Sequence, residues 1–319
     1  MGSIIDYAGL FPPAELSLDT SIRKYAAYRK SDDAWMLSRF IIPGERLHEL
    51  ESYHDELFEE ERPFRFSVLG KATDTLSDYE QELLQLIDFC RSFNEQHGDR
   101  VTTEILEIKL PKEAVFSGDA DLMQEVLDMT SDELSKSDKT PDYVFYEGYF
   151  EESWRKDIST WVEAISEHNQ EHNSANQYGY AGFKLRCGGV DAHMFPEVDK
   201  VAHSINITRE HSTVLKCTAG LHHPIRHYND TVKTKMHGFI NVFGGAMLAY
   251  AHDLNDDELE EILKEEDADQ FSFTEEDFRW KDLAVSTEDI EELREVAVTS
   301  FGSCSFDEPR EDLEKLNLL

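Results

Sequence analysis

Short apolar segments alternate with longer polar segments along most of this chain, and that alternation restricts the folds it can adopt. The short segments are rich in β-branched and aromatic residues. Such a pattern is typical of βα units arranged around a parallel sheet. We predict eight strands, within residues 3–9, 35–42, 64–70, 103–110, 142–149, 180–186, 213–219 and 299–306.

The intervening segments have helical periodicity, with charged residues on one face and apolar residues on the other. We predict helices over residues 18–30, 45–58, 78–96, 120–135, 153–170, 195–210 and 238–254. Strands and helices in this order predict a (β/α)8 barrel, whose helices pack outside the strands. The alternative is a doubly wound open α/β sheet, which the same alternation supports.

About eighty residues separate the last two predicted strands. We expect this interval to hold a further helix over 255–267, a hairpin within 269–282 and a helix over 286–298, with a short helix after the last strand over 310–319. No repeat, low-complexity tract or Pro/Gly-rich linker marks a boundary. The chain is therefore expected to form a single barrel domain, 1–319, with an insertion at about 254–285.

The net charge of -36 argues against nucleic acid or an anionic membrane surface as a partner, because both would be repelled. Such a charge suits a salt-loving organism, in which high ionic strength screens the repulsion between carboxylates. An acidic cytoplasmic protein of another origin is the alternative. The sequence does not predict an oligomeric state.

No secretory signal or membrane span is found, so we expect a cytoplasmic protein. The four cysteines are far apart and have no CxxC spacing, which favours reduced thiols over a disulfide framework or a structural zinc site.

Strand parity places several charged residues inside the predicted barrel, because alternate residues of a strand share one face. The inward set is Arg39, Glu107, Lys109, Glu147, Lys184, Arg186 and Lys216. Buried charges are costly unless they are paired, so this set is either an ion network or a functional site.

The segment from Tyr178 to Tyr250 is basic within an acidic chain. It holds eight Lys and Arg against five Asp and Glu, and seven of the thirteen histidines. A basic pocket in an acidic body would attract a small anionic substrate, and glycines after strands can form anion-binding nests. The expected substrate-binding residues are Arg39, Arg186, Gly188, Gly189, Gly220, Ser303 and Ser305.

The strings FKLRCGG and LKCTAG resemble, in placement, the two strand-end lysines of class I aldolases of the deoxyribose-phosphate type. The resemblance implies that one of Lys184 and Lys216 forms an imine and that the other lowers its pKa. We assign Lys216 as imine-forming nucleophile or electrostatic stabiliser, and Lys184 and Arg186 as anion clamp and pKa perturber. We assign Glu147 as acid/base and His222 or His223 as proton shuttle. The expected enzyme is a lyase or isomerase that acts on a small phosphorylated or carboxylate carbonyl compound, without a cofactor.

Two alternatives stay open. Asp6 with His222 and His223 resembles, at poorer spacing, the metal site of hydroxymethylglutaryl-CoA lyases, which would imply a divalent metal as cofactor and lyase chemistry. A further metal set combines His222 or His223 with His227 or His237 and a carboxylate such as Asp6 or Glu147. The protein could also be a non-catalytic barrel that binds an anion, with its lysines held in salt bridges.

The strings DYAGLFPPA, FKLRCGG, KCTAGLHHP and FGSCSFDEP together resemble a family of uncharacterised bacterial proteins. The resemblance spans nearly the whole chain. It implies no activity.

Overall fold

Eight parallel strands form a closed barrel in the computed structural model, which describes residues 2–136, 141–149, 151–172 and 180–319. The strands are β1 (Ile5–Tyr7), β2 (Leu37–Pro43), β3 (Phe64–Leu69), β4 (Val101–Lys109), β5 (Tyr143–Glu147), β6 (Tyr180–Arg186), β7 (Leu215–Thr218) and β13 (Val298–Ser303). Strand β1 pairs with both β2 and β13, so the sheet has no free edge. The predicted (β/α)8 barrel is confirmed, and the open sheet is excluded.

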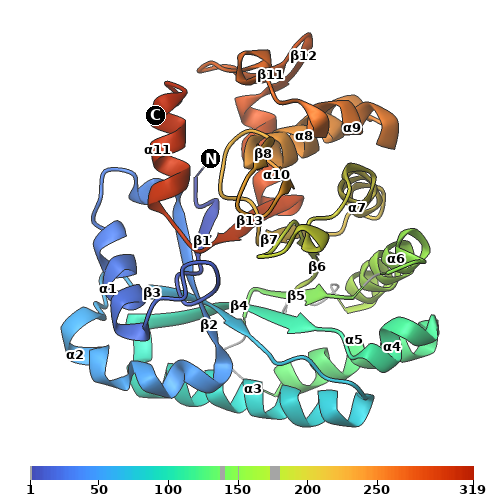
Figure 1. Cartoon of the computed structure of the whole chain (residues 1–319). Helices are drawn as coiled ribbons and strands as arrows, with labels where there is room; N and C mark the ends of the chain where they lie inside the picture. The colour runs from blue at the N-terminus through green and yellow to red at the C-terminus, as the bar shows by residue number, and fades with distance from the viewer. Residues whose placement is uncertain (1, 137–140, 150, 173–179) are drawn as a thin grey trace.

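The helices lie outside the strands (Figure 1). They are α1 (Leu18–Tyr28), α2 (His54–Leu57), α3 (Leu76–His97), α4 (Lys112–Ser117), α5 (Ala120–Leu134), α6 (Trp154–His172), α7 (Val198–Glu210), α8 (Phe239–His252), α9 (Asp256–Lys264), α10 (Thr287–Val296) and α11 (Asp307–Lys315). Each long helix buries an apolar stripe. In α6, Ile158, Trp161, Val162 and Ile165 are fully buried, as the helical spacing predicts.

The structure differs from the prediction over residues 45–58, where one α-helix was expected. A 3-10 helix spans Gly44–Tyr53, and only the single turn of α2 follows it. The buried residues of this segment, Leu47, Leu50 and Tyr53, recur every three positions. That spacing matches the three residues per turn of a 3-10 helix, in which residues i and i+3 share one face.

The region between β7 and β13 is richer in strands than predicted. In place of a hairpin it contains a three-stranded antiparallel sheet of β10 (Phe271–Phe273), β11 (Asp277–Trp280) and β12 (Leu283–Ser286). A two-stranded hairpin of β8 (His227–Asn229) and β9 (Thr234–Met236) follows β7. These strands are three or four residues long, too short for periodicity to reveal them.

The barrel interior has an apolar layer toward the amino ends of the strands. Ile105, Phe145 and Val214 form it, each two residues before a charged residue of β4, β5 or β7 and therefore on the same face. Gly182 leaves room for this layer, because a Cβ there would lie 2.5 Å from the ring of Phe145. The charged side chains lie in the next layers toward the carboxyl ends.

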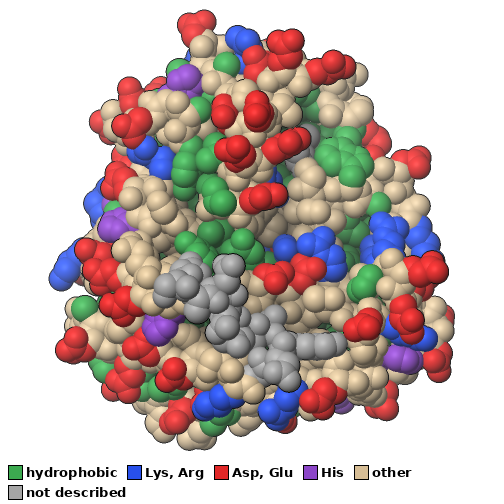
Figure 2. All heavy atoms as spheres, turned by 180° about the vertical axis from the view of Figure 1, so that it is seen from behind, with side chains coloured by type: hydrophobic (Ala, Val, Ile, Leu, Met, Phe, Trp, Pro, Cys, Tyr) green, Lys and Arg blue, Asp and Glu red, His purple; other side chains and the backbone are tan. Residues whose placement is uncertain are grey.

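The outer surface carries most of the acidic residues, and Figure 2 shows Asp and Glu spread over the face that it presents. Across the parts of the chain that the structure describes, every helix is too short or too polar to cross a membrane.

The acidic outer surface leads to a prediction about how salt affects the stability of the fold. With a net charge of -36, repulsion between surface carboxylates destabilises the folded state at low ionic strength. Raising KCl from about 0.1 M to about 1 M shortens the Debye length from about 10 Å to about 3 Å. We expect the thermal midpoint to rise over that range, measured by circular dichroism. A midpoint that falls or stays constant would contradict this expectation.

Candidate active site at the carboxyl ends of the barrel strands

Seven charged side chains of alternating sign form one chain of ion pairs through the barrel interior. In spatial order they are Arg39, Asp6, Lys216, Glu107, Lys184, Glu147 and Arg186. They come from β2, β1, β7, β4, β6 and β5, with β6 contributing both Lys184 and Arg186. Six of the seven residues that strand parity placed inside the barrel therefore belong to an ion network that crosses it. The seventh, Lys109, instead donates to the Tyr149 hydroxyl at 3.0 Å.

The contacts in this chain are close. Lys184 Nζ lies 2.7 Å from Glu107 Oε2 and 2.7 Å from Glu147 Oε2. Arg186 Nε lies 3.0 Å from Glu147 Oε1. Lys216 Nζ contacts the Asp6 carboxylate and lies 3.6 Å from Glu107 Oε1.

Two hydroxyls complete the network. Ser300 donates to Asp6 Oδ2 at 2.7 Å and accepts from Lys216 at 3.1 Å. Ser67 donates to Glu107 Oε1 at 2.5 Å. These bonds satisfy lone pairs that burial would otherwise leave without partners.

Burial and pairing act in opposite directions on the pKa values of these groups. Burial alone would raise the pKa of Glu147, but Lys184 and Arg186 lower it to about 2. Burial would lower the pKa of Lys184, but Glu107 and Glu147 raise it to about 12. Lys216 and Arg39 likewise outweigh burial and hold the pKa of Asp6 well below its usual value. Asp6, Glu147 and Lys184 are therefore ionised at neutral pH.

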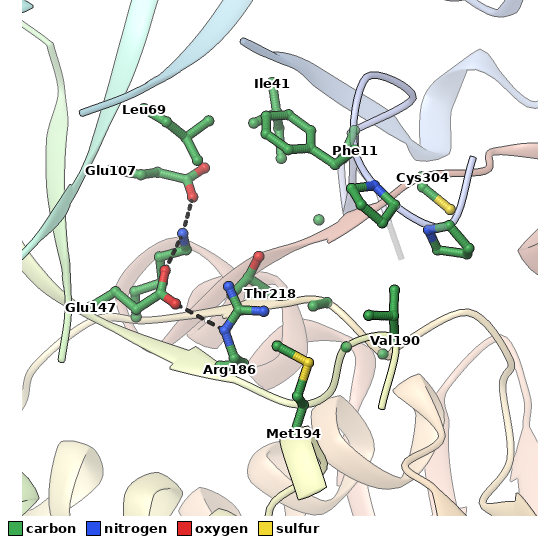
Figure 3. A pocket seen from close by; sticks show the side chains of 18 of the residues that line it. Phe11, Ile41, Leu69, Glu107, Glu147, Arg186, Val190, Met194, Thr218 and Cys304 are labelled. Carbon is green, nitrogen blue, oxygen red and sulfur yellow. Dashed lines mark hydrogen bonds and ion pairs between the residues drawn. The ribbon is translucent and has the colours of Figure 1, made fainter. Parts of the chain in front are cut away.

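A cavity of about 270 Å³ opens at the carboxyl ends of the strands, next to one end of this network. Figure 3 shows Glu107, Glu147 and Arg186 on one side of it and Phe11, Val190 and Cys304 on the other. The further lining residues are Ala8, Pro12, Pro13, Ile41, Leu69, Lys109, Lys184, Gly189, Met194, Thr218, Ala219, Gly220, His222 and Gly302. Active sites of barrel enzymes lie at this end of the strands.

His222 is a titratable group of the cavity wall that lies outside the ion network. Its Nδ1 lies 3.2 Å from Glu308 Oε2 and 3.9 Å from Cys304 Sγ. Burial would lower the pKa of His222, but the hydrogen bonds with Cys304 and Glu308 raise it to about 9. His222 is therefore protonated at neutral pH and can donate a proton.

The predicted residues divide into two groups. Six of them line the cavity: Glu147, Lys184, Arg186, Gly189, Gly220 and His222. The others, Arg39, Lys216, Gly188, His223, Ser303 and Ser305, are outside the described lining.

Arg39 and Lys216 are the two predicted cations that do not line the cavity, and their depth along the strands explains this. Ile41 and Thr218 line the cavity, and Arg39 and Lys216 precede them by two residues on the same strands. A step of two residues keeps the face but moves one interior layer down. Lys216 is consequently fully buried beneath the cavity floor, and Arg39 pairs with Asp6 and Glu104.

The remaining predicted residues serve the local fold. His223 pairs with Asp312 of α11 at 2.5 Å. Ser303 faces away from the barrel interior and donates to the carbonyl of Ser305 at 2.7 Å. Ser305 Oγ accepts from the backbone N–H of Glu308 at 3.1 Å, in the first turn of α11.

The alternative metal set of Asp6, His222 and His223 is separated by these contacts. Asp6 is buried against Lys216, while the two histidines pair with different carboxylates of α11. In the described ranges, the one group of His, Cys, Asp or Glu ligand atoms close enough to share an ion is Asp128, His168 and His172. This group is on the outer helices, and none of its members lines the cavity.

Sequence reasoning missed Cys304, Glu308 and the aromatic residue Phe11. Cys304 follows β13 with the same parity as Ser300 and Gly302, so its inward position could have been inferred. Phe11 lies in the loop after β1, and no periodicity indicated where that loop would fold.

The buried pair of Lys216 and Asp6 generates a stability prediction. Lys216→Met leaves the Asp6 carboxylate buried without its closest cation, and we expect a loss of about 3–5 kcal/mol in the free energy of unfolding. The exposed pair of Lys30 and Glu59 is the control, because Lys30→Met should cost less than about 1 kcal/mol. Urea denaturation measures both. Equal losses in the two variants would contradict the prediction.

His222 generates a prediction about pH. Its pKa in the folded state, about 9, lies above its ordinary value of 6.5. The protonated form is therefore stabilised by folding, so the contribution is complete below about pH 6.5 and is lost as pH rises through about 9. We expect the difference in unfolding free energy between wild type and His222→Gln to shrink over that range. A difference that grows with pH would refute the assignment.

Comparison with known proteins yields no match to a protein-family model and no match to a curated protein. The resemblance to uncharacterised bacterial proteins stays a prediction. What can be inferred about activity therefore comes from the geometry of the cavity.

Proposed function

We propose that the protein is an enzyme that acts on a small anionic carbonyl compound, phosphorylated or carboxylate, by lyase or isomerase chemistry. The observation that carries the proposal is Lys184, buried in the cavity wall between Glu107 and Glu147, with Arg186 beside it. Such a set combines a fixed cation, carboxylates and an anion-binding guanidinium at the catalytic end of a barrel.

The charge of the cavity supports an anionic substrate. Its lining contains Lys109, Lys184 and Arg186 against Glu107 and Glu147, and His222 is protonated at neutral pH. This wall is positive, whereas the whole chain has a net charge of -36. An electrostatic field of this kind concentrates an anion at the cavity. The cavity volume of about 270 Å³ suits a small molecule.

The environment of the lysines favours electrostatic stabilisation over imine formation. An imine-forming lysine must be unprotonated, and the two glutamates raise the pKa of Lys184 to about 12. Lys216 is fully buried and is outside the described cavity lining. We therefore assign Lys184 to the stabilisation of a developing enolate oxygen, and Lys216 to the support of Glu107 from below.

Glu147 and His222 supply the proton-transfer groups in this proposal. Glu147 is ionised, so its carboxylate can accept a proton from the carbon next to the substrate carbonyl. Binding of a substrate anion to Arg186 would weaken the Arg186–Glu147 pair and raise the basicity of Glu147. His222 would donate a proton to the substrate or hold its anionic group.

A non-catalytic anion-binding barrel is the second candidate, because Lys184 and Lys216 are each paired with two carboxylates. The two candidates make different demands on Glu147. A binding protein needs it only to hold Lys184 and Arg186, whereas an enzyme needs its basicity.

The test uses a panel of phosphosugars and keto acids, with ligand binding measured by calorimetry and proton exchange with D2O followed by NMR. We expect Glu147→Gln to bind the active compound but to lose exchange and turnover by a factor of about 10²–10⁴. Glu80→Gln, on the outer helix α3, should retain both. We also expect Arg186→Gln to raise KM more than it lowers kcat.

Borohydride reduction in the presence of the active compound separates the two roles of lysine. We expect no covalent adduct. An adduct on Lys184 or Lys216 would replace electrostatic stabilisation by an imine mechanism. Binding without exchange or turnover in wild type would favour the non-catalytic barrel, and failure of every anion to bind would overturn the proposal.

A further inference from the structure

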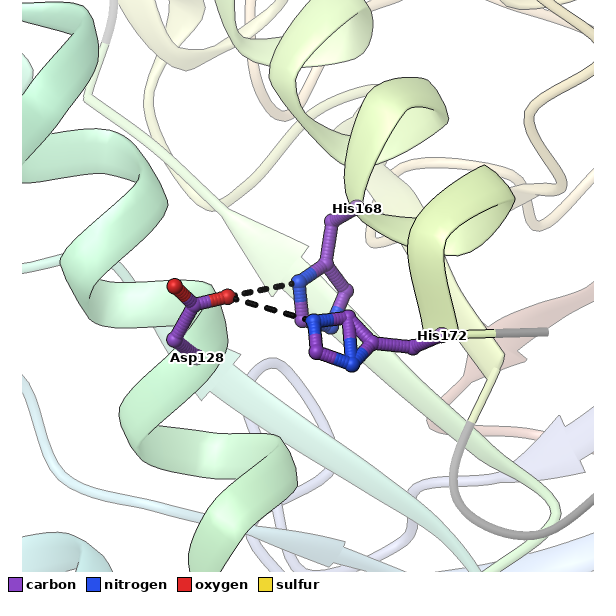
Figure 4. A group of neighbouring side chains, drawn as sticks. All are labelled: Asp128, His168 and His172. Carbon is purple, nitrogen blue, oxygen red and sulfur yellow. Dashed lines mark hydrogen bonds and ion pairs between the residues drawn. The ribbon is translucent and has the colours of Figure 1, made fainter. Parts of the chain in front are cut away.

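Three side chains with metal-binding atoms meet on the outside of the barrel, between α5 and α6 (Figure 4). Asp128 is on α5, and His168 and His172 are on α6. The two histidines are four residues apart, so they lie one above the other on the same face of the helix. Figure 4 shows both rings directed toward the carboxylate of Asp128.

The spacing of these atoms fits a tetrahedral metal ion. Asp128 Oδ1 lies 3.1 Å from His168 Nδ1 and 3.5 Å from His172 Nε2. Ligands bound to Zn²⁺ at about 2.0–2.1 Å in tetrahedral geometry lie about 3.3–3.4 Å from one another. The two distances fall on either side of this value, and all three ligand atoms lie within 4.8 Å of one another.

Neighbouring side chains orient the ligands in the way that metal sites require. Ser131 Oγ lies 3.3 Å from His168 Nε2, so a proton on Nε2 leaves the lone pair of Nδ1 directed toward Asp128, where the Gln124 amide nitrogen also lies 3.3 Å from it. Gln124 Nε2 donates to Asp128 Oδ1 at 2.8 Å, which orients the carboxylate. His168 is buried, so its ring is held in one place.

We propose that Asp128, His168 and His172 bind a divalent transition-metal ion of the Zn²⁺ class, with water in the fourth position. Two imidazoles and one carboxylate favour such an ion over Mg²⁺ or Ca²⁺, which prefer oxygen ligands. The groove beside the site is acidic, because Asp121, Glu125 and Asp132 line it with Asp128. The ion joins α5 to α6 and stabilises their packing. The proposal is independent of the reaction proposed for the cavity.

The experiment titrates the full chain, freed of metal by a chelator, with ZnCl2 in a calorimeter. We expect one Zn²⁺ ion per chain at this site, undisturbed by Mg²⁺ in tenfold excess, and a thermal midpoint that rises with Zn²⁺ concentration. His172→Ala and Asp128→Asn should lose this binding and the rise in the midpoint. His48→Ala is the matched control, since His48 is an exposed histidine outside the group, and it should retain both.

His172 is exposed, so its replacement should leave the metal-free protein folded, and the metal-free thermal midpoint checks this. If His172→Ala nevertheless fails to fold, Asp128→Asn alone decides. Equal Zn²⁺ binding by wild type and Asp128→Asn would show only general attraction of the ion to the acidic surface, and it would overturn the proposal. Loss of the bound Zn²⁺ to Mg²⁺, or the absence of Zn²⁺ binding, would do the same.

Discussion

The chain of alternating charges inside the barrel constrains the rest of this structure. Three carboxylates and three of the four cations are largely removed from water, and each is tolerable only because its neighbour in the chain has the opposite sign. The fourth cation, Arg186, is partly exposed. Six strands contribute to the chain, and β13 adds the Ser300 hydroxyl. A slip of one residue in any of these strands would turn its charged side chain outward and leave its partners buried and unpaired.

The same network links the fold to the candidate chemistry. Its deep part, at Asp6 and Lys216 next to the terminal Arg39, is fully buried, while its other end reaches the cavity through Lys184, Glu147 and Arg186. The pKa values at the open end follow from this arrangement. Because Lys184 lies between two carboxylates, it stays charged despite its burial, and a charged lysine suits the stabilisation of an anion. Removal of the charge of Asp6 or Lys216 is thus expected to alter the electrostatics at Lys184, Glu147 and Arg186.

Strand parity predicted the interior position of Glu107, Glu147, Lys184 and Lys216 because the two-residue period of a strand depends on local geometry alone. The depth of each of these side chains along the barrel axis could not be predicted from strand parity. It depends on how neighbouring strands are staggered, which only the pairing registers set. Although Lys184 and Lys216 are paired in register, Lys184 lines the cavity, whereas Lys216 is fully buried.

The histidines also show the difference between what the sequence indicated and what the tertiary contacts decided. The sequence marked the adjacent residues His222 and His223 as one candidate group, but α11 returns to this end of the barrel and supplies a separate carboxylate to each. His222 faces the cavity with Cys304, and His223 does not line it. Likewise, Asp128 is forty residues from His168 in the sequence, and only the packing of α5 against α6 brings them together.

By itself, the amino-acid sequence determined the alternation of strands and helices, the acidity of the surface, and which face of each strand carries charge. These properties follow from local periodicity and composition. The tertiary structure alone decided which charges meet, which of them reach the cavity, and which histidines acquire carboxylate partners. Those outcomes depend on barrel closure, strand stagger and contacts between residues far apart in the sequence, and no local pattern encodes them.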